Sequence, residues 1–159
     1  MHTSHFISNT PPRAGIPSTG AASAWTKLRL HRVRSAIETH DLVKRGVPVS
    51  DARQLLRALD IISQGEFYEV LVINPRTMER RAETGKKTLD RNSSDNVLRL
   101  VSVMEQAIMV LGSQAEAERW LTSPAIGLDQ RKPIELLQST EGTMLVKTLL
   151  TRMEYGVYA

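Results

Sequence analysis

Residues 63–85, with the sequence SQGEFYEVLVINPRTMERRAETG, contain the local signals that decide the fold. Ser63 and Glu66 form an S-x-x-E capping box, in which each side chain bonds the backbone N–H of the other residue. Ile62 precedes the cap and Phe67 occupies the fourth helical position, which is the spacing of a hydrophobic staple. This part of the stretch predicts a short helix that begins directly after the serine.

The second half of the stretch starts another helix. Asn74-Pro75 reads as an N-cap residue followed by proline at the first helical position. Gly85 suits the left-handed residue that follows a helix end, so this helix is expected to stop just before it. Two short helices joined by a tight turn make a helix-turn-helix.

Helical signals also precede this motif. Residues 25–43 carry Leu30, Val33 and Ile37 at helical spacing, which predicts one long helix. Ser50 is expected to cap the next helix, whose apolar stripe consists of Ala52, Leu55, Leu56 and Leu59.

Further helical segments are expected after the motif. Ser94 is expected to cap a long helix that ends at Gly112, and Ser113 with Glu116 forms a second capping box. Pro133 can start a single turn. A last helix is expected from about Thr140, with a buried stripe of Leu145, Val146, Leu149, Leu150 and Met153. No alternating strand pattern is present, so the chain is expected to be all-α.

Composition and charge divide the chain. Residues 1–93 have a net charge of +6 and residues 94–159 one of −2, which indicates two partners of different kinds or simply a solvated basic surface. We expect a disordered arm over 1–24, because it is rich in Pro, Gly, Ser and Thr. A helix-turn-helix domain over 25–93 and a small helical domain over 94–159 are expected to follow. The chain has no cysteine and no membrane-length apolar run, which favours a cytoplasmic protein.

The second helix of the motif is basic on one side. Its arginines and threonines share one arc, Met78 and Ala82 form an apolar arc suited to docking on the preceding helix, and Glu79 and Glu83 form a third. Arginine can bridge a guanine edge or grip a phosphate. We therefore expect DNA contacts from Arg76, Thr77, Arg80, Arg81, Lys86 and Lys87, the alternative being a solvated helix face with surface ion pairs.

The residue inventory argues against catalysis. All four histidines lie within the first 40 residues, and residues 41–159 contain neither His nor Cys, so a nucleophilic centre based on either is excluded there. No metalloprotease, P-loop or dinucleotide-binding motif is present. We expect no enzyme activity, no catalytic residue, no metal and no cofactor.

The order of motifs from about Gly46 onward resembles the Xre/MbcA/ParS family of antitoxins. In the first half the resemblance rests on residues 75–81, PRTMERR, with Leu89 after them, and on residues 94–100, SDNVLRL. Asn96 departs from the family pattern, where Arg is usual. In the second half it rests on 117–121, Pro124, 126–128, 133–137, 140–142, and on Val146, Leu149, Arg152, Met153 and Tyr155 to Tyr158.

This resemblance implies a type II antitoxin. Its first half would bind operator DNA and repress its own operon as a homodimer, and its second half would bind and block a RES-type toxin that consumes NAD⁺. The toxin-binding residues would be Leu128, Leu136, Arg152, Tyr155, Gly156, Val157, Tyr158 and Ala159. Two of the three tyrosines lie in the last five residues, where they suit interface anchors that obstruct the toxin's active site, unless both rings fold back on the chain's own core. A stand-alone helix-turn-helix repressor, whose C-terminal half dimerises or senses a ligand, is the alternative.

Overall fold

The structure, a computed structural model, describes residues 24–31 and 34–156. The expected arm over 1–24 therefore lies outside the described residues, apart from its last one. In chain order the helices are η1 (Ala24–Lys27), η2 (Arg29–His31), α1 (Ala36–Arg45), α2 (Val49–Ala58), α3 (Gln64–Leu71), α4 (Pro75–Glu83), α5 (Arg91–Leu111), α6 (Gln114–Leu121), η3 (Ile126–Leu128), η4 (Pro133–Gln138) and α7 (Thr140–Glu154). The all-α expectation is confirmed, since the described ranges hold no strand and only isolated bridges, Pro48 to Thr88 and Ala125 to Arg131.

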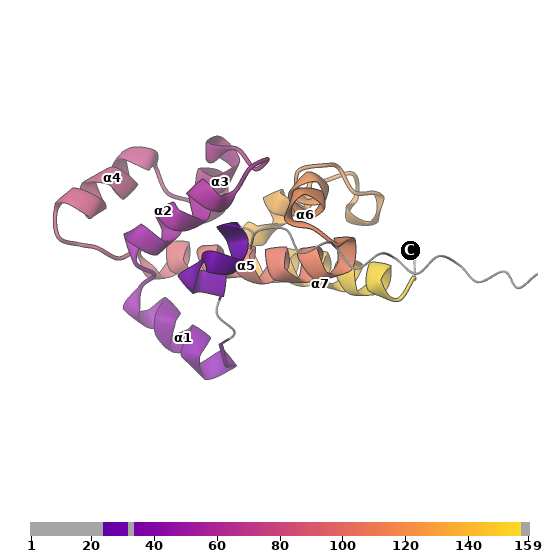
Figure 1. The fold of residues 1–159 in the computed structure, drawn as a ribbon, viewed down its shortest axis with the longest axis horizontal. Helices are drawn as coiled ribbons and strands as arrows, with labels where there is room; N and C mark the ends of the chain where they lie inside the picture. Colours follow the sequence, from indigo (N-terminus) through magenta and orange to yellow (C-terminus); the bar gives the residue numbers. More distant parts are fainter. Residues whose placement is uncertain (1–23, 32–33, 157–159) are drawn as a thin grey trace, which may run out of the picture.

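The central helix of the fold is α5, which has 21 residues. It packs against α1, α3, α6 and α7. Figure 1 shows α5 and α7 side by side, with α2, α3 and α4 gathered at one end of the molecule. One hydrophobic core includes side chains from all these parts, and the boundary expected between residues 93 and 94 falls in the first turn of α5.

The expectation of one long helix over residues 25–43 is wrong. The described part of this segment forms two 3-10 turns, η1 and η2, and then a separate helix, α1. Ser35 and Glu38 form a capping box that begins α1, with Ser35 N donating to Glu38 Oε2 at 2.8 Å. Ile37, which follows Leu30 at helical spacing, is 69% exposed, because α1 projects from the body and has no fully buried residue. Val33 lies outside the described residues.

The helix starts are partly as expected. The capping box of Ser63 is confirmed, with Glu66 N donating to Ser63 Oγ at 3.2 Å and Ser63 N to Glu66 Oε2 at 2.9 Å. Asn74 caps α4 through its side chain, and Pro75 is the first residue of that helix. Ser50 does not cap α2, because the helix begins at Val49.

The expected cap at Ser94 is also wrong. Asp90 caps α5, accepting a hydrogen bond from Ser93 N at 2.9 Å. Ser94 is buried inside the helix, where its hydroxyl accepts a hydrogen bond from Val47 N at 2.9 Å. This hydrogen bond therefore holds the segment before α2 against α5, and the residue that caps α5 is Asp90.

The last helix buries fewer residues than expected. Ser139 caps α7, and Val146 and Leu150 are fully buried, but Leu145 is 57% exposed. The N-terminal turn of α7 packs closely on η4, since a Cβ added at Gly142 would lie 2.1 Å from Leu136 O. At Ser113, only half of the expected capping box forms, through Glu116 N. None of the described helices combines the length and the apolar character needed to cross a membrane.

Candidate nucleic-acid and partner-binding surfaces

The basic helix α4 docks through its apolar arc. Met78 is fully buried, and Ala82 packs against the core beside it. The helix packs on α2 more than on the directly preceding helix α3, which corrects the expectation from sequence. The turn before α4 contains Val72 at φ +53°, a left-handed conformation that is costly for a β-branched residue and makes the turn tight.

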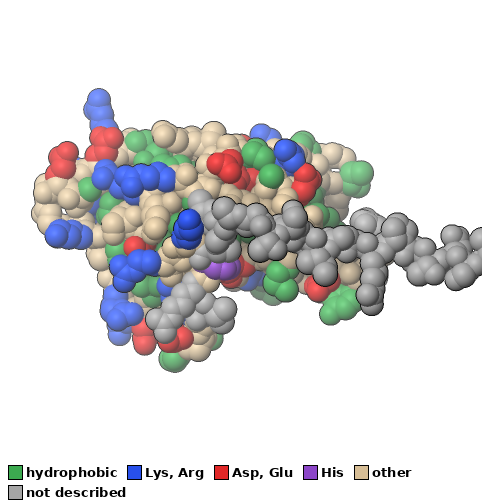
Figure 2. Space-filling view, in the orientation of Figure 1, with side chains coloured by type: hydrophobic (Ala, Val, Ile, Leu, Met, Phe, Trp, Pro, Cys, Tyr) green, Lys and Arg blue, Asp and Glu red, His purple; other side chains and the backbone are tan. Residues whose placement is uncertain are grey.

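The opposite arc of α4 faces solvent. Arg76 and Arg80 are exposed, and neither has an ion pair with any described residue. Thr77, at the edge of the same arc, is half-buried. Lys86 and Lys87 follow on an exposed loop, likewise without a carboxylate partner in the described ranges. In Figure 2, Lys and Arg side chains gather over the end of the molecule that α2 and α4 form, with acidic groups interspersed. The side chains of Arg76, Arg80, Lys86 and Lys87 are therefore accessible to a phosphate group.

Arg81 differs from its neighbours. Its guanidinium donates to Thr88 O at 3.2 Å and lies 3.5 Å from Asp90 Oδ2. Partial burial raises the pKa of Asp90, but the hydrogen bonds from Ser93 and the charge of Arg81 outweigh it, so the pKa lies below its ordinary value. Arg81 thus joins the end of α4 to the cap of α5. Because its guanidinium is engaged in these contacts, this geometry does not support the expected DNA contact of Arg81.

The expected partner-binding residues separate into two groups. Leu128 is 6% exposed and belongs to the core, so it offers little surface to a partner, and Leu136 is half-buried against the core. Arg152, Tyr155 and Gly156 are exposed at the end of α7. Tyr155 is 75% exposed, so its ring does not fold back on the core. Residues Val157, Tyr158 and Ala159 lie outside the described residues.

Further apolar residues, which are not among the expected partner-binding residues, are exposed on α7 and near it. Met144 is 63% exposed. Together with Leu145 it falls within an arc of about 100° that also holds Glu141, Thr148, Arg152 and Tyr155, so these side chains lie on one side of α7. Ile126 is 81% exposed and precedes Gly127, which rests on the Leu149 side chain of α7. The α7 outer face is defined here as the exposed residues Glu141, Met144, Leu145, Thr148, Arg152 and Tyr155.

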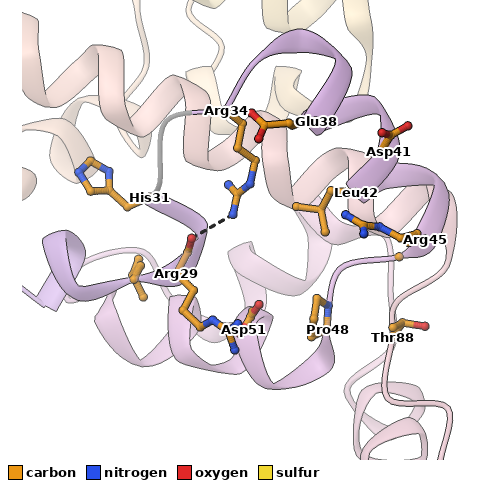
Figure 3. A pocket seen from close by; sticks show the side chains of 12 residues that line it. Arg29, His31, Arg34, Glu38, Asp41, Leu42, Arg45, Pro48, Asp51 and Thr88 are labelled. Atoms are coloured by element: carbon orange, nitrogen blue, oxygen red, sulfur yellow. Dashed lines mark hydrogen bonds between the residues drawn. The ribbon is translucent and has the colours of Figure 1, made fainter.

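A cavity of about 730 Å³ lies between α1, η2 and α2 (Figure 3). Its lining is mostly charged and of both signs, with Arg29 and Arg45 near Asp41 and Asp51. Small-molecule sites are usually lined by apolar groups with a few placed polar ones. This lining does not have that character, and the described residues contain no cluster of His, Cys, Asp and Glu suited to a metal ion.

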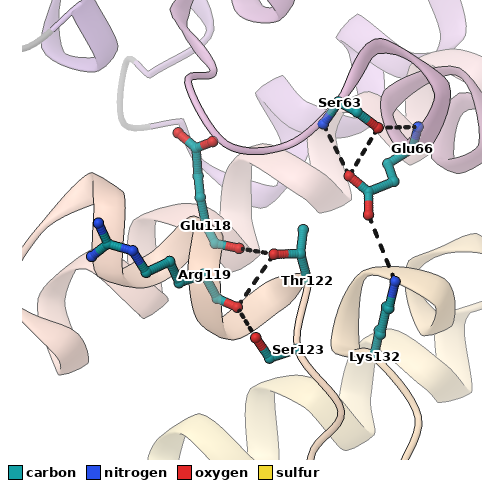
Figure 4. Close-up of polar contacts among 7 residues, drawn as sticks. All are labelled: Ser63, Glu66, Glu118, Arg119, Thr122, Ser123 and Lys132. Atoms are coloured by element: carbon teal, nitrogen blue, oxygen red, sulfur yellow. Dashed lines mark hydrogen bonds and ion pairs between the residues drawn. The ribbon is translucent and has the colours of Figure 1, made fainter.

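A buried carboxylate joins the two halves of the chain. Glu118 of α6 is 0% exposed, and it points toward the loop between α2 and α3 (Figure 4). Its oxygens accept hydrogen bonds from the backbone N–H groups of Asp60, Ile61 and Ile62 at 2.6–3.2 Å. Gln114 Nε2 adds another at 2.7 Å. Successive backbone N–H groups in a turn form a nest, a site that binds an anion. Here the carboxylate of Glu118, from the same chain, occupies this nest.

No local sequence pattern predicts this contact. Glu116 and Glu118 lie two positions apart and do not share a helical face, so neither stands out as a pair. The partner groups are backbone atoms more than fifty residues away, and only the fold brings them together.

Two family models match separate parts of the chain. Residues 38–102 match the antitoxin Xre-like helix-turn-helix domain, and residues 106–156 match the antitoxin Xre/MbcA/ParS C-terminal toxin-binding domain. The first contains the α3–α4 pair and the second contains the α7 outer face. The protein is therefore an antitoxin that joins a helix-turn-helix domain to a toxin-binding domain. It belongs to the Xre/MbcA/ParS family of antitoxins.

Curated relatives agree with this assignment over most of the chain. Antitoxin Xre of Yersinia enterocolitica is 28% identical over 90% of this chain and 95% of its own length. The Prs ADP-ribosylating antitoxin of Sphingobium sp. is 25% identical over 79% of this chain and 83% of its own length. Antitoxin Xre of Photorhabdus laumondii is 26% identical over 73% of this chain and 78% of its own length.

Proposed function

We propose that this antitoxin neutralises a RES-type toxin that consumes NAD⁺, and that it does so by laying the α7 outer face and the end of α7 against the toxin's active site. The observation that carries the proposal is the exposure of Met144, Leu145 and Tyr155 on one side of a helix within the matched toxin-binding domain. Large apolar and aromatic side chains that are exposed together favour a protein interface.

The chemistry of the toxin is proposed from likeness. The motif series resembles antitoxins that partner RES-type toxins, and the name of the Sphingobium relative refers to ADP-ribosylation, a reaction that consumes NAD⁺. Arg152, which lies between the apolar residues of the α7 outer face, supplies a cation that can pair with a carboxylate on the toxin.

We further propose that the helix-turn-helix domain binds the operator of its own operon as a homodimer. Arg76 and Arg80 are directed to solvent without carboxylate partners in the described ranges, and Lys86 and Lys87 extend the positive surface past α4. A dimer would place two α4 helices on successive half-sites of the duplex, which is how helix-turn-helix proteins recognise operators.

Co-expression with the adjacent reading frame tests the toxin proposal. Leu145→Asp should abolish protection of the cells, because it places a charge in the centre of the interface, while DNA binding and the melting temperature stay at wild-type values. Met109→Asp provides a matched control, because Met109 is exposed on α5 and is not part of the α7 outer face. Equal protection by both variants would contradict the proposed surface. A stand-alone repressor is indicated if the neighbouring frame encodes no toxin.

A further inference from the structure

The loop between α6 and η4 is held in shape by its own backbone. Residues 125–131, which contain η3, are here called the η3 loop. Its two ends meet, because Ala125 N donates to Arg131 O at 3.0 Å. Ala125 O also accepts hydrogen bonds from Leu128 N and Gln130 N, both at 3.0 Å. The side chain of Leu128 is 6% exposed and anchors the loop in the core, so hydrogen bonds and burial together fix its position.

Two consecutive residues of the η3 loop have a left-handed backbone. Asp129 has φ +53° and Gln130 has φ +62°. Aspartate adopts this conformation more readily than most residues, whereas glutamine adopts it rarely and at a cost. Such conformations persist only where the surrounding structure holds them, and they are concentrated at binding sites. The backbone of the loop is therefore held in a shape that its residues would not choose by themselves.

The η3 loop presents one large apolar side chain to solvent. Ile126 is 81% exposed, which is more than Leu145 at 57% or Met144 at 63%. Single exposed apolar residues are ordinary on a protein surface. Ile126 differs from them because it lies on a loop fixed by hydrogen bonds and is followed by residues that pack on α7.

The η3 loop borders the α7 outer face. A Cβ added at Gly127 would lie 3.0 Å from Leu149 Cδ1, so the loop rests directly on the side chain of Leu149. Leu149 lies one helical turn after Leu145 and about 40° away from it around α7. Figure 1 shows the chain after α6 forming this loop on the side of the molecule where α7 ends. Ile126 and Leu145 thus belong to neighbouring parts of one surface.

We propose that Ile126 is a second anchor for the toxin, which inserts into an apolar pocket on the toxin surface while the α7 outer face covers the active site. The inference rests on the proposed function, since the partner is the same toxin. Both the η3 loop and the α7 outer face lie within residues 106–156, the matched toxin-binding domain. The pocket would be lined by apolar groups and would fit a branched side chain of four carbons.

The fixed shape of the loop explains how one side chain can matter for affinity. A loop that is already ordered loses little conformational entropy when it binds, and a flexible loop loses more. A branched apolar side chain in a matching pocket also distinguishes the cognate toxin from a related toxin whose pocket is filled or charged. Ile126 is therefore a residue that determines which toxin is bound.

The first test labels position 126. The chain has no cysteine, so Ile126→Cys introduces a single thiol on the antitoxin. The rate of its alkylation is followed by the mass of the antitoxin, with and without the purified product of the adjacent reading frame. Bound toxin should slow the reaction by about tenfold or more, because an anchor in a pocket is removed from solvent.

The matched control is Ile37→Cys. Ile37 is also isoleucine and is 69% exposed, but it lies on α1, outside the toxin-binding domain. Its alkylation rate should not change when toxin binds. If toxin binds and position 126 still reacts at the rate of the free protein, the anchor role is overturned while the proposed function stands. If the reaction at position 126 slows at raised antitoxin concentration without toxin, a second copy of the chain covers the loop, and the inference is overturned.

The second test measures affinity for the same toxin. Ile126→Ala should weaken binding by about tenfold and Ile126→Asp by about a hundredfold or more, with the melting temperature unchanged, because the side chain is exposed in the free protein. Ile37→Asp should bind as the wild-type protein does. Wild-type affinity of Ile126→Asp together with loss of binding by Leu145→Asp would overturn the second anchor alone. If the wild-type protein does not bind the toxin, both proposals are overturned.

The third test concerns the shape of the loop. Gln130→Gly relieves the left-handed conformation but gives the loop more freedom. The melting temperature should stay the same or rise, while the affinity for toxin should fall by about threefold, since the loop must then be ordered on binding. An unchanged affinity would overturn the role of the fixed backbone.

Discussion

Glu118 Oε2 lies 2.6 Å from the backbone nitrogen of Ile61, so the toxin-binding domain supplies the acceptor for a loop of the helix-turn-helix domain. The carboxylate is fully buried and also accepts from the neighbouring N–H groups of Asp60 and Ile62. Charged acceptors make the stronger class of hydrogen bond, and buried donors left without a partner are costly.

Glu118→Ala should therefore lower the free energy of unfolding by on the order of 3 kcal/mol, because it leaves several donors unpaired in a dry site. Urea denaturation followed by circular dichroism measures this directly. Glu116→Ala, on the exposed side of the same helix, should cost no more than about 1 kcal/mol. Similar losses for the two variants would mean that the loop finds other acceptors.

Gly142 provides a second test of the packing between α7 and η4. A Cβ at this position would lie 2.1 Å from Leu136 O, which is backbone and cannot rotate away. Gly142→Ala should therefore destabilise the protein by about 1–3 kcal/mol through overpacking. Gly65→Ala is the matched control, because a Cβ there meets nothing nearer than 3.9 Å and alanine favours the helix. The two changes should shift the melting temperature in opposite directions.

Arg80 and Arg81 are adjacent, and the structure predicts different consequences for their loss. Arg80→Ala should weaken operator binding by about 1–3 kcal/mol with the melting temperature unchanged, since Arg80 is exposed and unpaired among the described residues. Arg81→Ala removes the contacts to Thr88 and Asp90 and should lower the melting temperature as well. Electrophoretic mobility shift and calorimetry on both variants measure the difference. If Arg81→Ala weakens DNA binding at an unchanged melting temperature, Arg81 contacts DNA directly.

The helix-turn-helix could be predicted because its signals are local. The Ser63 capping box and the Asn74 cap each involve residues no more than three positions apart, so sequence alone places them correctly. Ser94 is a case in which local sequence signals do not predict the cap correctly. Serine and aspartate both suit an N-cap. Only the fold shows that the hydroxyl of Ser94 accepts a hydrogen bond from the backbone N–H of Val47, which lies 47 residues away in the sequence.

Burial was harder to predict than helix type. Ile37 and Leu145 both follow helical spacing, yet both are exposed, because spacing shows which residues share a face and says nothing of which face another element covers. The same limit applies to the binding surfaces. The exposure of Arg76 and Arg80 follows from their arc on α4, whereas the nest at Glu118 depends on a long-range contact that leaves no local pattern.

Acid sensitivity provides a last prediction, based on Asp90. The pKa of this carboxyl is held below its ordinary value of 3.8, since the Ser93 hydrogen bonds and the Arg81 charge outweigh the effect of burial. A lowered pKa in the folded state means that the ionised form stabilises the fold above the ordinary value, and that this contribution is lost as the pH falls through the lower, folded value. Asp90→Asn should therefore lower stability near neutral pH and flatten the loss of stability below about pH 4.

Asp129→Asn is a suitable comparison for this change, because Asp129 has no hydrogen bond or ion pair to a described side chain and asparagine tolerates its left-handed backbone. Urea denaturation of both variants and the wild-type protein at a series of acidic pH values separates them. Asp129→Asn should follow the wild-type curve. If Asp90→Asn also follows it down to the lowest pH, then the cap of α5 and its link to Arg81 contribute nothing to acid unfolding, and α4 is held to the core by its packing on α2 alone.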